Sequence, residues 1–345
     1  MDRVKVGVIG VGNMGQRHCR VYSSLPQARL VGVCDIAPEV GARIARQYGV
    51  PFYASVDRLL SHVDAVSIAT PTALHYDLAM RCLARGVHVL IEKPITDSPE
   101  QAEALAQAAA ASGLVVQAGH IERFNPTYLE LKAVLKDVTI LAINLRRLSA
   151  YAGSNTDVDV ILDLMIHDLD LALDLLGQEP TAVDAYGLTA FSGAVDHAVA
   201  HLWVDAGPLV TITASRVTEQ KIRAIEVTAA EAYLEGDLLN KTISVHRHTI
   251  GQYLSNHQRG VKYRQEGIIE RIHVPMFEPL FLELEHFVEC VMHRQPPRVP
   301  IGDAVKALRL AFLIRDAVGR RLIDLTRVRS PQYLAAQPAW AEALG

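Results

Sequence analysis

Three closely spaced glycines follow the first strand-like run of this chain and restrict how its N-terminal part can fold. The apolar run Val4–Ile9 leads directly into the segment Gly10-Val11-Gly12-Asn13-Met14-Gly15, which opens a predicted helix. In that context Gly10 permits a tight turn, Gly12 lets the backbone approach a pyrophosphate, and Gly15 lets the helix pack closely on the strand. The helix N-terminus then faces the phosphates. The pattern predicts a dinucleotide-binding βα turn, with Asn13 and Met14 among its cofactor-binding residues.

An acidic residue ends the second predicted strand, at the distance from Gly15 that ribose-binding acids have in this motif. A carboxylate at this position, Asp35, accepts hydrogen bonds from the adenine-ribose hydroxyls and repels a 2′-phosphate. We therefore expect NAD rather than NADP as the cofactor. Arg43 or Arg46 could still fold back toward a phosphate.

The first part of the chain alternates short β-branched runs with helical segments, which is the pattern of parallel βαβ units. Strands are predicted at Val4–Ile9, Leu30–Cys34, Ala65–Ala69, Val87–Ile91 and Leu114–Gln117. Helices are predicted at Met14–Ser23, Pro38–Tyr48, Thr72–Arg85 and Pro99–Ser112, the last with Ser98 as N-cap and Gly113 as stop. We therefore expect residues 1–120 to form an α/β Rossmann domain that binds NAD.

The pattern changes after Asn125-Pro126, where strand-like runs follow one another without helices between them. These runs are Thr181–Leu188, Ala198–Trp203, Leu209–Ser215, Ala224–Thr228, Ala232–Glu235 and Thr242–His246, preceded by Thr139–Arg147. Consecutive strands without crossovers imply an antiparallel sheet. Helices are predicted at Pro126–Lys136, Val160–Leu176, Pro279–Met292 and Ile301–Arg320. Since 345 residues are about twice the usual domain size, residues 121–345 are predicted to form a second, α+β domain, whose C-terminal helices could pack back on the first.

Composition argues against several kinds of partner. The formal net charge of -4 is small for this length, which argues against a protein that neutralises nucleic-acid phosphates. The four cysteines are scattered without a Cys-x-x-Cys pair, so neither a disulfide framework nor a zinc site is expected. No run approaches the roughly 20 apolar residues of a membrane helix. Because the strand at Val4 leaves no room for a signal peptide, we expect a cytoplasmic protein without a metal, nucleic-acid or membrane partner.

A lysine stands at the end of the predicted strand Val87–Ile91, in the sequence Glu92-Lys93-Pro94. Ligands of open α/β sheets bind at the carboxyl ends of the strands. A lysine there can donate to a substrate hydroxyl and stabilise the alkoxide that forms as hydride departs, while the proline restricts the backbone. The three residues are candidates for cofactor binding, and Lys93 is also a candidate catalytic residue.

The neighbouring strand ends in Ala69-Thr70-Pro71, and His75 lies in the helix that follows. A loop at this place would lie over the cofactor, so these residues are candidates for cofactor binding. His75 is either part of that site or a histidine on a helix face with a satisfied hydrogen bond.

Asp163 and His167 are four residues apart in the predicted helix Val160–Leu176, so they share a face. A carboxylate in that position can orient the imidazole and raise its basicity, as a general base for alcohol oxidation requires. Metal ligation is the rival chemical interpretation, although no third ligand stands at a suitable spacing. A solvated acidic face is the structural alternative, but the apolar residues around Asp163 favour a covered helix.

Polar residues concentrate between Gly119 and Pro126, where the chain passes from the first predicted domain to the second. Small-molecule sites occur preferentially between domains. Candidates for substrate binding here are His120, Glu122, Arg123 and Asn125. Roles in a hinge or a surface loop remain open for each of them.

Together these motifs resemble the Gfo/Idh/MocA family of sugar and inositol dehydrogenases. The resemblance covers nearly the whole chain and includes the glycine turn, Asp35, Ala69-Thr70-Pro71 with His75, Glu92-Lys93-Pro94, Arg123-Phe124, and Asp163 with His167 followed by Leu169-Asp170. It implies a second domain with a large, mostly antiparallel open sheet that pairs subunits into a homodimer or homotetramer. It also implies a catalytic set of Lys93, Asp163 and His167, and a cis peptide bond before Pro94.

One feature departs from the family pattern, since the segment from Asp159 to His167 contains no glycine. This variant, together with the segment Gly119–Pro126, is similar to the branch of UDP-N-acetylglucosamine 3-dehydrogenases, whose 3-keto product supplies an aminotransferase for lipid A. The resemblance implies hydride transfer from the 3-hydroxyl of that nucleotide sugar to NAD, with either His167 or Lys93 as the base. An inositol or free-sugar dehydrogenase is the alternative within catalysis. A dinucleotide-sensing regulator without catalysis is the alternative of another class, although such a protein would be expected to lose Lys93 or the Asp-His pair.

Overall fold

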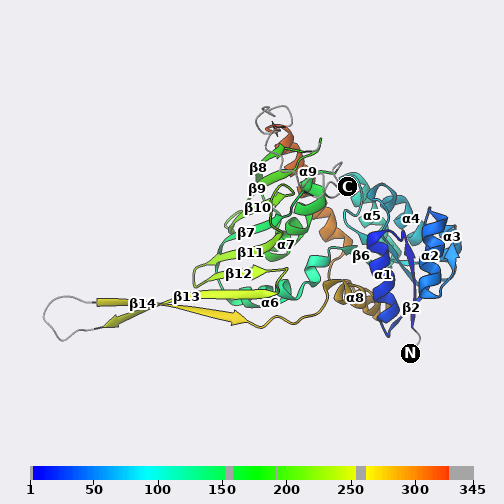
Figure 1. Ribbon diagram of the computed structural model, residues 1–345, viewed down its shortest axis with the longest axis horizontal. Helices are drawn as coiled ribbons and strands as arrows, with labels where there is room; N and C mark the ends of the chain where they lie inside the picture. Colours follow the sequence, from blue (N-terminus) through cyan, green and yellow to red (C-terminus); the bar gives the residue numbers. More distant parts are fainter. Residues whose placement is uncertain (1–2, 152–157, 192, 254–261, 326–345) are drawn as a thin grey trace, which may run out of the picture.

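The chain forms two β-sheets with helices between and around them (Figure 1). The computed structural model describes residues 3–151, 158–191, 193–253 and 262–325. Within these residues a six-stranded parallel sheet is followed by a nine-stranded, mostly antiparallel sheet. The predicted fold class, an α/β Rossmann unit followed by an α+β unit, is thereby confirmed. Residues 326–345, at the end of the predicted second domain, lie outside the described residues.

The first sheet has the strand order β3-β2-β1-β4-β5-β6, so the order of the strands reverses between β1 and β4. Ligands of open α/β sheets bind at the carboxyl ends of the strands at such a reversal. The strands are β1 (Val4–Ile9), β2 (Ala28–Cys34), β3 (Phe52–Tyr53), β4 (Ala65–Ile68), β5 (His88–Glu92) and β6 (Val116–Gly119). The connecting helices are α1 (Asn13–Ser24), α2 (Pro38–Tyr48), α3 (Val56–Leu60), α4 (His75–Ala84) and α5 (Pro99–Ser112).

Helices from the C-terminal part of the chain complete the cover of this sheet. Helix α8 (Pro279–His293) packs against α1 and β1, where Leu284 and Phe287 are fully buried. Helix α9 (Ile301–Gly319) packs against α5 on the other side and also against the second sheet. The two apolar faces of the first sheet are therefore covered partly by helices that come much later in the sequence.

The second sheet has the order β14-β13-β12-β11-β7-β10-β9-β8-β15. Its inward side chains alternate with outward ones along each strand, so that Ile143 and Leu145 of β7 are buried. Helices α6 (Pro126–Val134), α7 (Ile166–Leu176) and α9 lie on the face that points toward the first sheet (Figure 1). The strands are β7 (Ile140–Leu148), β8 (Ala182–Thr189), β9 (His197–Trp203), β10 (Leu209–Ser215), β11 (Ile222–Ala229), β12 (Tyr233–Asp237), β13 (Thr242–Tyr253), β14 (Lys262–Ile272) and β15 (Ile323–Asp324).

The predicted helix Val160–Leu176 differs from the structure at its start. Residues Ile161–Met165 form a π-helical turn, and the α-helix proper begins at Ile166. The carboxylate of Asp159 accepts hydrogen bonds from the backbone N–H groups of Ile161 and Leu162, at 3.0 and 2.8 Å, and so caps this wide turn. An apolar pattern read at one α-helical period does not distinguish such a turn from regular helix.

Two short elements, β3 and α3, were not predicted, because two and five residues are too few for a hydrophobic period to be recognised.

The predicted helix Pro99–Ser112 has the same bounds in the structure. The hydroxyl of Ser98 accepts a hydrogen bond from the N–H of Gln101, and Gly113 ends the helix with φ of 66°. Its caps were readable from the sequence because each depends on one residue type.

Candidate active site

Lys93 follows β5 directly and reaches across to the second domain. Its ammonium group donates to the carbonyl oxygen of Asp163 at 2.7 Å and lies 3.3 Å from the Asp163 carboxylate oxygen Oδ1. The Lys93–Pro94 peptide bond is cis, as the family resemblance implies. The side chains of Lys93 and Asp163 are 19% and 27% exposed, so the pair borders on solvent and is open to a ligand.

His167 is the second residue of α7 and is partly buried. Burial holds its pKa well below the ordinary value of 6.5, and the nearby charges of Lys93 and Arg147 lower that pKa further. Its Nδ1 atom has no hydrogen-bond partner among the described residues. The imidazole is therefore neutral at physiological pH, the state in which it can accept a proton.

The Asp163 carboxylate does not hold the imidazole in this structure. No hydrogen bond between Asp163 and His167 is found in the described part of the chain, and the carboxylate is paired with Lys93 instead. The four-residue spacing was interpreted on an α-helix, whereas Asp163 lies in the π-helical turn, where successive residues are rotated by a smaller angle. The structure thus brings all three predicted catalytic residues together but pairs the acid with the lysine.

His120 faces His167 edge-on, with 6.5 Å between the ring centroids. It is 1% exposed, and burial, with smaller contributions from Arg123 and Lys93, lowers the pKa of His120 to about 3. Both rings next to Lys93 are therefore neutral. Of the four predicted substrate-binding residues, His120 is the one that contacts the candidate catalytic set.

Glu122 and Asn125 belong to a buried ionic cluster behind His167. The guanidinium of Arg147 donates to both oxygens of Asp168 at 2.9 and 2.7 Å, and to Glu122 at 2.8 Å. Asn125 donates to the second oxygen of Glu122 at 2.9 Å. Burial raises the pKa of Glu122, but Arg147 and Asn125 outweigh that effect and the pKa of Glu122 is lowered. These groups satisfy one another's hydrogen bonds and charges, so we infer a structural role for them behind His167.

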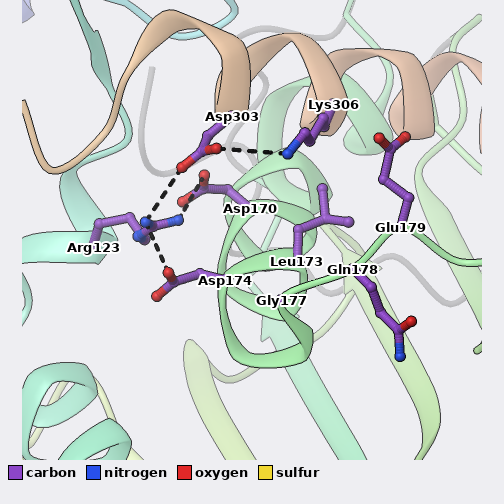
Figure 2. Close-up of a pocket in the computed structure, with 9 residues that line it drawn as sticks. All are labelled: Arg123, Asp170, Leu173, Asp174, Gly177, Gln178, Glu179, Asp303 and Lys306. Carbon is purple, nitrogen blue, oxygen red and sulfur yellow. Dashed lines mark hydrogen bonds and ion pairs between the residues drawn. The ribbon is translucent and has the colours of Figure 1, made fainter. Parts of the chain in front are cut away.

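Arg123 points into a cluster of carboxylates at α7 and α9. Figure 2 shows its guanidinium between Asp170, Asp174 and Asp303, at N–O distances of 3.4, 2.9 and 3.6 Å. A cavity of about 150 Å³ adjoins the cluster. Arg123 therefore does not lie with the candidate catalytic residues, although it was predicted to bind substrate.

The glycine turn leaves room for a dinucleotide. Gly10 has φ of +83°, and a Cβ on it would lie 2.7 Å from the carbonyl oxygen of Ala69. A Cβ on Gly15 would lie 1.9 Å from the carbonyl oxygen of Gly10, so the helix could not pack as closely. A Cβ on Gly12 would meet no protein atom within 4 Å, which leaves this backbone free for close approach by a pyrophosphate. Asn13 and Met14 form the first turn of α1 beside it.

Asp35 stands at the carboxyl end of β2, where its carboxylate holds the glycine turn. One oxygen accepts from the N–H of Val11 at 2.7 Å and the other from the N–H of Ala37 at 2.8 Å. The side chain of the next residue, Ile36, is 90% exposed. An acceptor and an open apolar surface therefore lie beside each other, which suits the ribose and adenine of a dinucleotide.

His75 connects the two predicted cofactor loops. Its ring nitrogens each lie 2.8 Å from a carbonyl oxygen, that of Thr70 in Ala69-Thr70-Pro71 and that of Pro94 after Lys93. Glu92 is buried and lies 2.9 Å from the Nε2 atom of His18 on α1. His75 therefore holds the backbone of both loops, and Glu92 ties the end of β5 to α1.

Arg147, Asp168 and Arg223 are the residues near the site that the sequence interpretation missed. Arg147 and Arg223 are directly opposite each other on β7 and β11. Burial and the neighbouring Arg147 lower the pKa of Arg223 to about 10. The sequence carried a signal for the two arginines, because each occupies an inward position of a strand whose other inward residues are apolar.

Two kinds of feature are absent from the described part of the chain. No group of three or more His, Cys, Asp or Glu residues is arranged to hold a metal ion there. No helix in those residues is long and apolar enough to cross a membrane.

Comparison with known proteins identifies the family. Residues 4–120 match the model of the oxidoreductase family with an NAD-binding Rossmann fold, and residues 147–235 match the GFO/IDH/MocA C-terminal domain. The chain is 34% identical to the UDP-N-acetylglucosamine 3-dehydrogenase of Acidithiobacillus ferrooxidans, over 92% of this chain and 98% of that protein. It is 29% identical to the scyllo-inositol 2-dehydrogenase (NAD(+)) of Bacillus subtilis, over 90% and 92% of the two chains.

The fold agrees with these sequence matches. A solved structure of the Acidithiobacillus ferrooxidans enzyme superposes with a TM-score of 0.83 at 33% identity, covering 93% of this chain and 99% of that one. The glycine turn with Asp35 fits the NAD-binding description of the family. The chain therefore belongs to the Gfo/Idh/MocA family of oxidoreductases, with an NAD-binding Rossmann fold.

Proposed function

We propose that this protein oxidises the 3-hydroxyl of UDP-N-acetylglucosamine with NAD, giving the 3-keto sugar nucleotide. The observation that carries the proposal is the contact of Lys93 with Asp163 beside a neutral His167, at the carboxyl end of β5. This contact supports the proposal because alcohol oxidation by hydride transfer requires a base and a cation at the same hydroxyl. The choice of sugar rests on the similarity to the Acidithiobacillus ferrooxidans enzyme. The product would be a substrate for amination, and so for amino-sugar and lipid A synthesis.

In this mechanism each candidate residue has a separate task. His167 takes the proton of the sugar hydroxyl, because burial keeps its ring neutral. Lys93 donates to the same oxygen and stabilises the alkoxide as it develops. Asp163 holds the ammonium of Lys93 toward the site through its carbonyl and carboxylate oxygens. NAD, when bound, accepts the hydride.

These positions suggest a different binding role for each of the two parts of the chain. We propose that residues 1–120 bind NAD, through the turn of Gly10, Gly12, Asn13, Met14 and Gly15, with Asp35 at the ribose. The loops Ala69-Thr70-Pro71 and Glu92-Lys93-Pro94, tied by His75, would lie along the nicotinamide half. Residues 121–345 would shape the sugar site, which His120 borders.

An inositol dehydrogenase is the second candidate, favoured by the match to the Bacillus subtilis enzyme over most of the chain. The segment Asp159–His167 would decide between the two, because it contains no glycine, whereas the family pattern has glycines before and within this motif. A change in the shape of the substrate pocket at this segment would change whether a nucleotide sugar or a cyclitol fits.

The substrate is tested by incubating the protein with NAD and UDP-N-acetylglucosamine, with 2-oxoglutarate added in case bound cofactor must be recycled. Mass analysis is expected to find a product that has lost two hydrogens from the sugar. Free N-acetylglucosamine, scyllo-inositol and myo-inositol are run in parallel. Oxidation of an inositol without any change in the nucleotide sugar would decide for the second candidate.

Replacement of Lys93 by Met tests the alkoxide role. We expect turnover to fall about 10³-fold, the loss typical for removal of one donor to a developing oxyanion, while NAD binding measured by calorimetry stays unchanged. Lys241→Met is the matched control, because the ammonium of Lys241 also donates to a backbone carbonyl, that of Phe277. Wild-type turnover in Lys93→Met would refute the assignment.

The pH dependence of kcat/KM for the sugar tests the base. Because burial places the pKa of His167 below 6.5, the neutral form persists as the pH falls through 6.5. We expect kcat/KM to stay level down to about pH 6 and to decline only below it, when the ring takes a proton. A decline centred at or above pH 6.5 would mean that His167 titrates like a solvated histidine or that another group is the base.

We further propose that the protein is a homodimer or homotetramer that pairs through the outer face of the nine-stranded sheet. The helices cover the opposite face (Figure 1), while Tyr186, Trp203 and Leu209 are each about half exposed on the outer one. Light scattering is expected to give a mass above that of the 37.8 kDa chain, and Trp203→Glu should lower it. A monomer at micromolar concentration would contradict this assembly.

A further inference from the structure

Arg123 joins three segments of the chain that are far apart in sequence. Its Nη1 atom lies 3.4 Å from Asp170 on α7, and its Nη2 atom lies 2.9 Å from Asp174 on α7 and 3.6 Å from Asp303 on α9 (Figure 2). The Nη2 group also lies 3.4 Å from the carbonyl oxygen of Arg298. Arg123 belongs to the 3-10 turn Ile121–Phe124, which follows the last strand of the first sheet. We call this arrangement the Arg123 clasp.

Two members of the Arg123 clasp are almost completely buried. The side chains of Arg123 and Asp170 are 6% and 1% exposed. Asp174 is held from its other side by Lys132, at 2.6 Å, and by the hydroxyl of Tyr128, both on α6. A buried guanidinium with paired carboxylates keeps one geometry, because any shift would leave a charge without a partner.

Two of the three segments that the clasp joins lie next to candidate catalytic residues in the chain or in the first sheet. The turn with Arg123 continues from His120 and from β6, whose Gly119 is paired with Glu92, the residue before Lys93. Helix α7 carries His167 one turn before Asp170. The link from Arg123 to α7 therefore ties the turn after the first sheet to the helix that carries His167, and the contact of Lys93 with Asp163 joins the same sheet to the turn before that helix.

We propose that Arg123 is a positioning residue, whose ion pairs with Asp170 and Asp174 set the place of His167 relative to Lys93. It contacts neither substrate nor cofactor in this role. The inference rests on the proposed function for the tasks of Lys93 and His167. A displacement of about 1 Å at a reacting group can lower a rate about 100-fold, so such a residue acts on turnover more than on binding.

The test compares Arg123→Lys, Arg123→Met and the double variant Arg123→Met/Asp170→Asn. The double variant matters because Arg123→Met alone leaves the buried Asp170 without its cation and is expected to unfold more readily. Burial raises the pKa of Asp170 to about 8, and replacement by Asn removes the remaining carboxylate, which should restore the melting temperature. Arg309→Lys is the matched control, since Arg309 on the same helix as Asp303 forms an exposed ion pair with Glu103.

We expect kcat to fall about 10-fold in Arg123→Lys and about 100-fold in the double variant, with NAD affinity within about twofold of wild type. Arg309→Lys should match wild type in both. If Arg123 served stability alone, the double variant would recover kcat together with its melting temperature, and that result would overturn the proposal. A loss of NAD affinity with unchanged kcat would overturn it as well.

A second measurement does not depend on the sugar. In protein labelled with ¹⁵N-histidine, the ring signals of His167 and His120, assigned by His→Gln variants, are expected to move in Arg123→Lys and to stay in place in Arg309→Lys. Unmoved signals would refute the positioning role even if no substrate is oxidised by the wild-type protein. Absence of sugar oxidation by the wild type would instead count against the proposed function, so the two failures are distinguishable.

Discussion

The contact between Lys93 and the π-helical turn Ile161–Met165 is the constraint on which the candidate site depends. One ammonium group at the end of β5 binds a carbonyl oxygen and a carboxylate of the other domain. An ammonium in a half-buried position needs such partners, since a charge without them is costly to keep out of water. The same contact brings His167 beside the lysine, because that histidine follows the turn by two residues.

The buried charged side chains around this contact form two separate clusters. Arg147 is paired with Asp168 and Glu122 behind His167, and Arg123 is paired with Asp170 and Asp174 further along α7. Burial and these cations lower the pKa of both His167 and His120, so the two rings are the neutral groups at the centre. A base with a depressed pKa is thus obtained mainly by burial, with the cations as a secondary influence.

Much of the fold was readable from the sequence, because it depends on signals carried by single residue types. The glycine turn, Ser98 and Gly113 each have one local meaning, and the fold class they indicated is confirmed. The partners of Asp163 and Arg123 were not readable, because they depend on which residues meet across the two domains. Helical spacing suggested Asp163 for His167, but a π-helical turn changes the direction of the carboxylate and Lys93 takes it. The roles assigned to these side chains remain proposals.

The position of α8 and α9 has a consequence for how the protein folds during its synthesis. Ribosomes release a chain from its N-terminus, and α1 and β1 emerge long before Leu284 and Phe287, which cover them. Until then the first sheet has an uncovered apolar face, although its strands are all present. The nascent Rossmann half is therefore expected to need shielding from aggregation during most of translation, and a fragment that ends near residue 120 would carry that exposed face permanently.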